Sequence, residues 1–217
     1  MKKLFILLCF SLFIPWACFA QQPKPNQKYL VQLPIGYNEN IKYPLFVAIL
    51  WYDGTAQQQV NEWKFYANKE KYILLCPQFN EGYQQFRGRE DKKLIEIIEE
   101  VEKKFSIDQG NIFLVGFSGG AQFVHRFAFK HPGYLKAACI MSAGDYDVPP
   151  DSLEAKKIKY FVAVGEEDER FKATEHFYQQ LKNKGYDAVF ESVPMAGHTM
   201  SSNFKGRVIA FLRKQIK

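Results

Sequence analysis

Cysteine is scarce in this sequence, and that scarcity limits how the chain can be stabilised. Four cysteines occur in 217 residues, and two of them lie within the first 20 residues. The other two, Cys76 and Cys139, sit in apolar, strand-like runs. A disulfide scaffold needs several bridges, so that class of small exported protein is excluded. We predict two buried free thiols, with a single bridge between them as the alternative.

Concentrated charge is also missing. The net charge of +6 at pH 7 comes from basic residues that are scattered along the chain. Nucleic-acid-binding proteins carry basic blocks or recognisable motifs, and neither occurs here. The glycines at positions 116, 119 and 120 have the wrong spacing for a G-x-G-x-x-G phosphate loop. The sequence therefore predicts a mildly basic surface and no nucleic-acid partner.

One apolar run is long enough to suggest a membrane or export segment. Lys2 and Lys3 precede the run Leu4–Ile14, and small residues follow it up to Ala20. A spanning helix needs about 20 apolar residues, and Pro15 interrupts this run well before that length. Positive charge, a short apolar core and a small-residue exit, in that order, are typical of a secretory signal peptide.

These features predict a simple domain organisation. We expect a signal peptide at residues 1–20, a short tail at 21–27 and a single domain at 28–217. The protein would then be exported, to the periplasm or the medium, with no membrane span after cleavage. Lipidation of Cys18 is the alternative, although Pro15 and Trp16 fit a lipoprotein signal poorly. The 197 residues that remain are ample for one hydrophobic core.

Strand-like and helical patterns alternate along the rest of the chain. Several strand-like runs are continuously apolar, as in strands that are buried on both faces. In the segment Arg89–Phe105, four apolar residues (Leu94, Ile97, Ile98 and Val101) share one helical face. The alternation predicts an α/β fold with a mostly parallel central sheet, covered by helices on both faces. The expected strands are Tyr29–Leu33, Leu45–Leu50, Tyr72–Cys76, Ile112–Val115, Ala137–Met141, Tyr160–Val164 and Ala188–Val193. The expected helices are Gln57–Asn68, Arg89–Phe105, Ala121–Lys130, Phe171–Lys184 and Phe204–Ile216.

The strongest motif is Gly116-Phe117-Ser118-Gly119-Gly120, which follows one expected strand and opens the next helix. A G-x-S-x-G between strand and helix is a nucleophile elbow, whose tight turn exposes the serine hydroxyl. The helix that follows points its first amides at any oxyanion that develops there. We predict Ser118 as a nucleophile, and a glycine-rich turn with an idle serine is the alternative.

A histidine in a suitable loop supports this interpretation. His125, His131 and His176 lie on or at the end of expected helices, where packed or solvated histidines are common. His198 instead lies in a loop between the last strand and the last helix. This fold delivers its general base from that loop, so we predict His198 as the base.

The acid of a catalytic triad is expected after the strand that precedes the final strand. Asp168 occupies that loop, and it would hold the tautomer of His198 and stabilise its charged form. The chain order is then serine, aspartate, histidine, as in α/β-hydrolases. The competing carboxylates are Glu166, Glu167, Asp145 and Asp147.

On these motifs the chain resembles the α/β-hydrolase superfamily. It is similar in particular to the small esterase branch that includes phospholipase/carboxylesterase-like and polyhydroxybutyrate depolymerase-like enzymes. The resemblance covers nearly all of the chain after residue 20. It implies a serine esterase that hydrolyses carboxylic esters through an acyl-enzyme, with no metal and no organic cofactor. Its partner would be a small-molecule or polymer-end ester.

One motif departs from this family. Relatives carry His-Gly after the second core strand, where the next backbone amide completes the oxyanion hole, whereas this chain has Trp51-Tyr52-Asp53-Gly54. By position, we expect the backbone amides of Asp53 and Gly119 to form the hole. An impaired hole would slow the enzyme by a factor on the order of 10² or more.

The loops around the expected site also bear on the substrate. No long insertion separates Met141 from Tyr160, the usual place for a lid, so an open site and soluble substrates are expected. Six aromatic residues on candidate loops could form a platform, with ordinary packing as the alternative: Trp51, Tyr52, Tyr83, Phe86, Phe117 and Tyr146.

Two other functions compete with an esterase. A prolyl-oligopeptidase-type serine peptidase shares the triad and its order, but no large companion domain is present to gate peptides. A non-catalytic binding protein could keep the fold, since a fold does not imply a function. The sequence determines neither the acyl and alcohol groups nor the oligomeric state.

The export prediction can be tested by mass. Intact-mass analysis of the protein recovered outside the cytoplasm should give a chain that begins at Gln21, because the apolar segment is removed on export. A diacylated N-terminal Cys18 would establish the lipoprotein route instead, and a mass that retains residues 1–20 would exclude both.

Overall fold

The computed structural model describes residues 28–216, and the expected signal peptide and tail lie outside them. Seven strands form one sheet in the order β1-β3-β2-β4-β5-β6-β7. β1 pairs with β3 in antiparallel fashion, and the other pairings are parallel. This confirms the predicted fold class. The strands are β1 (Tyr29–Gln32), β2 (Tyr43–Ile49), β3 (Ile73–Pro77), β4 (Ile107–Phe117), β5 (Ala137–Met141), β6 (Lys159–Gly165) and β7 (Ala188–Val193).

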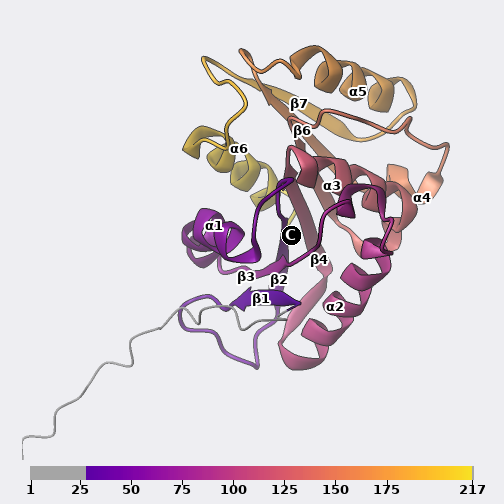
Figure 1. The fold of residues 1–217 in the computed structure, drawn as a ribbon. Coiled ribbons are helices and arrows are strands. Elements are labelled where there is room, and N and C mark those ends of the chain that lie inside the picture. The colour runs from indigo at the N-terminus through magenta and orange to yellow at the C-terminus, as the bar shows by residue number, and fades with distance from the viewer. Residues whose placement is uncertain (1–27, 217) are drawn as a thin grey trace, which may run out of the picture.

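Helices cover both faces of the sheet (Figure 1). Apolar residues of α2, α3, α4 and α5 pack on one face, and those of α1 and α6 pack on the other. The helices are α1 (Ala56–Glu70), α2 (Glu90–Lys104), α3 (Gly119–Lys130), α4 (Leu153–Lys156), α5 (Phe171–Asn183) and α6 (Ser202–Arg213). Two 3-10 turns, η1 (Tyr83–Gln85) and η2 (Pro132–Tyr134), were not expected from the sequence, and neither was α4.

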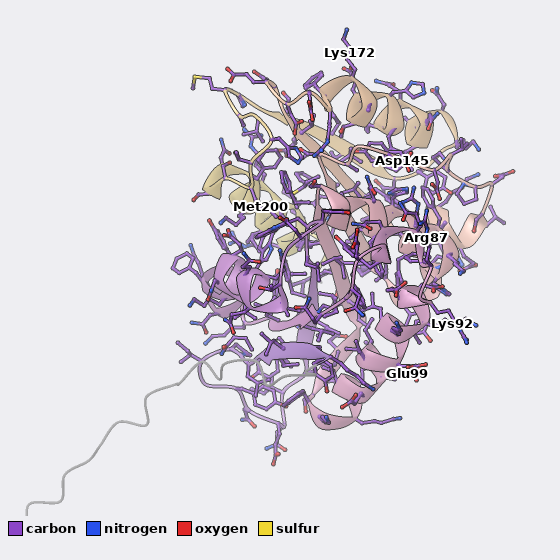
Figure 2. The ribbon with its side chains drawn as sticks, in the orientation of Figure 1. Arg87, Lys92, Glu99, Asp145, Lys172 and Met200 are labelled. Atoms are coloured by element: carbon purple, nitrogen blue, oxygen red, sulfur yellow. The ribbon has the colours of Figure 1, made fainter. Side chains whose placement is uncertain are left out.

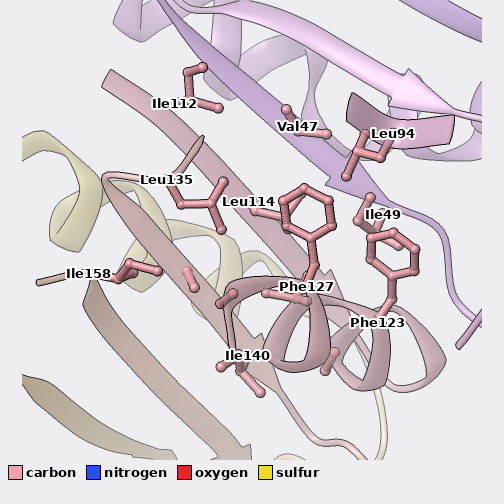
Figure 3. Packing of buried hydrophobic residues seen from close by; sticks show 14 of the residues in the cluster. Val47, Ile49, Leu94, Ile112, Leu114, Phe123, Phe127, Leu135, Ile140 and Ile158 are labelled. Carbon is pink, nitrogen blue, oxygen red and sulfur yellow. The ribbon is translucent and has the colours of Figure 1, made fainter. Parts of the chain in front are cut away.

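The side chains of the central strand β4 contribute to the hydrophobic cores on both faces of the sheet. Ile112 and Leu114 belong to the core on the α2–α5 face, whereas Phe113 and Val115 belong to the core on the α1 and α6 face. Successive side chains of a strand point to opposite faces, so an uninterrupted apolar run serves both cores. Figure 3 shows Ile112 and Leu114 packed among residues of β2, α2 and α3.

β4 begins five residues earlier than its apolar run indicated. Its first part pairs with β2 through Ile107 and Asp108, and the register then shifts to Ile112 opposite Leu45. The intervening polar residues 109–111 form a bulge, in which apolar alternation is lost. The sequence pattern therefore detected only the buried half of this strand.

The two cysteines are buried free thiols, as the sequence analysis predicted. Cys76 and Cys139 are buried and free, and desolvation by burial raises the pKa of each thiol well above its usual value. They act as small apolar side chains in the α1 and α6 core. Within residues 28–216, no helix combines the length and apolarity needed to cross a bilayer. That part of the chain also holds no group of three or more histidine, cysteine or acidic side chains that could bind a metal ion.

The central core should be sensitive to the loss of a single side chain. Leu114 is completely buried, so Leu114→Ala should lower the free energy of unfolding by about 2–5 kcal/mol through lost burial and a new cavity. Lys172 is exposed on α5 (Figure 2), and Lys172→Ala should change stability by less than about 0.5 kcal/mol. Urea denaturation of both variants measures the difference, and equal stabilities would contradict this assignment of the core.

Candidate active site

Ser118 lies at a sharp turn between β4 and α3. Its backbone has φ 54° and ψ −119°, a strained conformation of the kind that occurs at functional sites. The turn brings the strand and the helix so close that a Cβ on Gly116 would overlap the backbone of Gly120. A Cβ on Gly120 would lie 2.7 Å from the carbonyl oxygens of Ile49 and Leu50. The elbow therefore needs glycine at both positions.

The three predicted triad side chains form one hydrogen-bonded chain. Nε2 of His198 lies 3.0 Å from Oγ of Ser118, and Nδ1 of His198 lies 2.8 Å from Oδ2 of Asp168. The Asp168 side chain is fully buried, whereas that of His198 is 31% exposed. A hydrogen bond from Nδ1–H to the carboxylate leaves the lone pair of Nε2 facing the serine hydroxyl. This is the geometry in which histidine can act as a general base.

The electrostatics of Asp168 suit the role of an orienting anion. Burial by itself raises the pKa of this carboxyl, because it penalises the charged form. Hydrogen bonds outweigh burial: the backbone N–H of Arg170 donates to Oδ1 at 2.9 Å, and His198 binds Oδ2. The pKa of Asp168 consequently lies below its usual value, so the carboxylate is charged at neutral pH.

Two loops meet to bring the acid to the histidine. A Cβ on Gly165, at the end of β6, would overlap the backbone of Ala196, so only glycine permits this approach. The amide of Glu167 donates to the carbonyl of Ala196 at 2.9 Å, and the Glu167 side chain is exposed. The ring of Phe117 stacks on His198 with centroids 4.7 Å apart, which sets the plane of the imidazole.

The competing carboxylates bind other groups. Asp145 and Asp147 both accept hydrogen bonds from Arg126, at 2.6 and 2.9 Å. Glu166 accepts a hydrogen bond from the Ser192 hydroxyl at 2.8 Å. Of the acids considered in the sequence, Asp168 is the one that reaches the imidazole of His198.

The other three histidines, His125, His131 and His176, have partners or positions that do not involve the nucleophile. His125 is buried, with Nδ1 lying 3.0 Å from the carbonyl oxygen of Ala121. His131 contacts the buried carboxylate of Asp91 at 2.8 Å, and His176 is exposed on α5. Each of these histidines therefore lies away from Ser118, as the sequence analysis expected.

Free backbone amides lie beside the elbow. Trp51 to Gly54 form a tight turn, closed by a 3.0 Å hydrogen bond from the amide of Gly54 to the carbonyl of Trp51. The amide nitrogen of Tyr52 lies 3.0 Å from the position that a Cβ on Gly119 would occupy. Neither Tyr52, Asp53 nor Gly119 donates its amide to an acceptor within residues 28–216. Gly119 and Asp53 remain the predicted oxyanion donors, and the Tyr52 amide is a further candidate.

A cavity of about 490 Å³ opens at the nucleophile. Three of the six aromatic residues considered in the sequence (Trp51, Tyr52 and Phe117) contribute to its wall. Its lining residues are Trp51, Tyr52, Asp53, Glu62, Phe117, Ser118, Arg170, His198, Thr199 and Met200.

The other three aromatic residues lie outside this cavity and pack in the core or elsewhere on the surface. Tyr83 is completely buried. The ring of Phe86 lies against Phe123, with centroids 4.9 Å apart, and Tyr146 donates its hydroxyl to Thr174 at 2.9 Å. For these three residues the structure therefore shows the alternative, ordinary packing.

The sequence analysis missed Arg170. Its Nη1 lies 3.1 Å from Oγ of Ser118 and 2.9 Å from Nδ1 of His198, and it also contacts Nε2. The guanidinium is always charged and can only donate hydrogen bonds, so it favours negative charge near the serine oxygen. The sequence did contain one indication of this role. Arg170 follows Asp168 by two residues, in a loop at the carboxyl end of a strand, where site residues are expected.

Comparisons with known proteins identify relatives of this chain. The model of the dienelactone hydrolase family matches residues 77–206, a range that contains Ser118, Asp168 and His198. A probable feruloyl esterase C of Aspergillus terreus is 25% identical over 127 residues, which cover 55% of this chain and 47% of that protein. The Aspergillus oryzae protein of the same name is 29% identical over 128 residues, with the same coverage. The chain thus spans about half the length of these curated relatives.

Solved structures share the fold. A thermostable esterase superposes with a TM-score of 0.70 at 18% identity, over 86% of this chain and 58% of that one. A ferulic acid esterase from the anaerobic fungus Anaeromyces mucronatus gives a TM-score of 0.68 at 18% identity, over 85% and 83% of the two chains. At this level of identity the likeness establishes the α/β-hydrolase fold, and it does not extend to a substrate.

The acid can be distinguished from its nearest competitor by paired variants. Asp168→Asn should lower kcat by about 10⁴-fold, because the amide favours the wrong tautomer of His198 while the shape is retained. Asp145→Asn is the matched control, since Asp145 is 64% exposed and binds Arg126, and it should change kcat only modestly. Ester hydrolysis and circular dichroism of both variants measure activity and folding. The reverse result, with both proteins folded, would show that Asp145 is the acid.

Proposed function

Since the chain belongs to the dienelactone hydrolase family, we propose that it hydrolyses carboxylic esters through an acyl-enzyme formed on Ser118. The proposal depends above all on one observation, the hydrogen-bonded chain from Asp168 through His198 to Ser118 at a strained strand-to-helix turn. We further propose that the protein is exported, on the basis of the signal-like residues 1–20.

The first half of the proposed reaction forms the acyl-enzyme. Oγ of Ser118 attacks the ester carbonyl carbon while Nε2 of His198 removes its proton, and Asp168 stabilises the resulting imidazolium. The carbonyl oxygen becomes an oxyanion, which accepts hydrogen bonds from the amide of Gly119 and from an amide of the Trp51–Gly54 turn. His198 then gives its proton to the departing alcohol.

The second half of the reaction releases the acid. A water molecule takes the place of the alcohol, and His198 accepts its proton as the water attacks the acyl carbon. Collapse of the second tetrahedral intermediate returns the proton to Ser118 and frees the carboxylic acid. The Arg170 guanidinium, 3.1 Å from Oγ, supplies positive charge beside both intermediates.

The proposed substrates are soluble esters with short or aromatic acyl groups. The cavity of about 490 Å³ has Trp51, Phe117 and Met200 on its wall, which suits an acyl group of modest size. Between β5 and β6, the described chain carries only the four-residue helix α4, so no lid of the lipase type covers the site. The names of the two Aspergillus relatives support an aromatic acyl group.

Active-site labelling tests this function directly. A fluorophosphonate probe should label the purified protein, and Ser118→Ala should abolish labelling and lower esterase activity by about 10⁶-fold, since the serine provides the nucleophile. p-Nitrophenyl acetate and butyrate should be hydrolysed faster than the palmitate, because the cavity is small and open.

Ser202→Ala is the matched control, because Ser202 is an exposed serine on α6 outside the cavity, and labelling should persist. A folded wild-type protein that neither labels nor hydrolyses these esters would refute the esterase and favour a non-catalytic binding protein.

A further inference from the structure

Ser142 follows β5, between the strand that carries the nucleophile and the strand that precedes the acid. Met141, the last residue of β5, is in register with Phe117 of β4 and with Ala163 of β6. The amide of Ser118 donates to the carbonyl of Met141 at 2.9 Å. The amide of Ser142 donates to the carbonyl of Ala163, also at 2.9 Å. These bonds hold Ser142 at the same edge of the sheet as the triad, although it does not line the active-site cavity.

The backbone of Ser142 adopts a conformation that serine rarely takes. Its φ is 52°, in the left-handed region where glycine meets no steric penalty and a residue with a Cβ is strained. Strain of this kind is typical of functional sites, where another interaction maintains it. Glycine would form the same turn more easily, so the turn alone does not account for the Ser142 side chain.

The hydroxyl of Ser142 is fully buried, and within residues 28–216 no group meets it at full hydrogen-bond geometry. Other polar groups of the same turn are paired. The amide of Ala143 donates to the Tyr146 hydroxyl at 3.0 Å, and that hydroxyl donates to Oγ1 of Thr174 at 2.9 Å. A buried hydroxyl without a partner is unfavourable, so a nearby acceptor should receive its hydrogen.

The carboxylate of Asp168 is an acceptor with spare capacity. The Arg170 amide donates to Oδ1 and His198 binds Oδ2, whereas a carboxylate offers about four lone-pair sites. Burial raises the pKa of Asp168, and three donors lower it: the Arg170 amide, the His198 ring and the Ser142 hydroxyl. The Ser142 hydroxyl therefore lies close enough to favour the charged carboxylate. A hydroxyl hydrogen turns about its C–O bond, so rotation of this side chain completes a hydrogen bond.

We propose that Ser142 is a positioning residue of the triad, whose hydroxyl donates a hydrogen bond to the Asp168 carboxylate and fixes its orientation toward His198. The inference rests on the proposed function, in which His198 is the general base. A carboxylate can turn about its Cβ–Cγ bond, and a third donor, from the turn after β5, opposes that rotation. Asp168 then keeps Nδ1–H of His198 in place, and Nε2 faces Ser118.

Two substitutions separate the hydroxyl from the turn. Ser142→Ala removes the hydroxyl, and Ser142→Gly removes it while also relieving the positive φ. With p-nitrophenyl acetate, kcat should fall about tenfold in both variants, the effect of one lost hydrogen bond to a charged group. KM should stay at the wild-type value, because Ser142 lies outside the cavity lining. Wild-type kcat in a folded Ser142→Gly protein would show that the residue serves the turn alone.

Ser192→Ala is the matched control for these variants. Ser192 lies on β7, and its hydroxyl donates to Glu166 at 2.8 Å instead of to the triad. Its loss removes a serine hydroxyl bound to a carboxylate that takes no part in the proposed reaction, so kcat should remain that of the wild type. Circular dichroism of all three variants checks that they are folded.

Titration of Asp168 measures the proposed hydrogen bond without turnover. Carbon-13 NMR follows the aspartate carboxyl carbons, and Asp168→Asn identifies the relevant signal. The pKa of Asp168 should rise in Ser142→Ala and in Ser142→Gly, because the charged form loses a donor, and should not move in Ser192→Ala. The other charged or titratable groups that act on this carboxyl are the same in each variant: His198, Arg170 and Tyr146.

The two measurements distinguish the possible failures. An unchanged pKa of Asp168 in both Ser142 variants, or a raised pKa together with wild-type kcat, would overturn the positioning role and leave the esterase intact. A raised pKa in a folded protein whose wild type hydrolyses no ester would refute the proposed function, while the hydrogen bond from Ser142 to Asp168 would stand.

Discussion

The close approach of β4 to α3 is the constraint on which the site depends. Gly116 and Gly120 allow the two backbones to touch, and this contact holds Ser118 in its strained conformation. Strain of this kind persists only where surrounding structure enforces it, and here the buried second half of β4 and the buried residues of α3 do so. A side chain at Gly116 would separate β4 from α3, and one at Gly120 would separate α3 from the end of β2, so in either case the hydroxyl would no longer meet Nε2 of His198.

The fold also holds the charged groups around the imidazole of His198 close together. Asp168 is buried, yet it is ionised, because the Arg170 amide and His198 both donate to it. Arg170 places a positive charge against the histidine and the serine oxygen, and an oxyanion formed at Ser118 would compensate that charge. Arg126 meanwhile binds Asp145 and Asp147, which keeps the neighbouring carboxylates away from the imidazole.

The two spaces that share Tyr52 differ in chemistry because they lie between different elements. Side chains at the ends of β2, β4, β6 and β7, together with Glu62 of α1, line the cavity at Ser118, and several of them are apolar. The turn η1 and the first turn of α3 line a second cleft with glutamines. Tyr52 belongs to both, so the turn that carries the proposed oxyanion donors also contributes to the wall between the two spaces.

By itself, the sequence predicted seven strands, although only the buried half of β4, and five of the helices, and it singled out the three residues of the candidate triad. Period-two and period-3.6 patterns are local, and the order of loops in a parallel sheet places Ser118, Asp168 and His198 at one edge. Only the tertiary structure decided the roles of Arg170 and Tyr52 beside the nucleophile. Those roles depend on which side chains of distant loops share a space, and the inward turn of Tyr83 and Tyr146 depends on packing that no local pattern records.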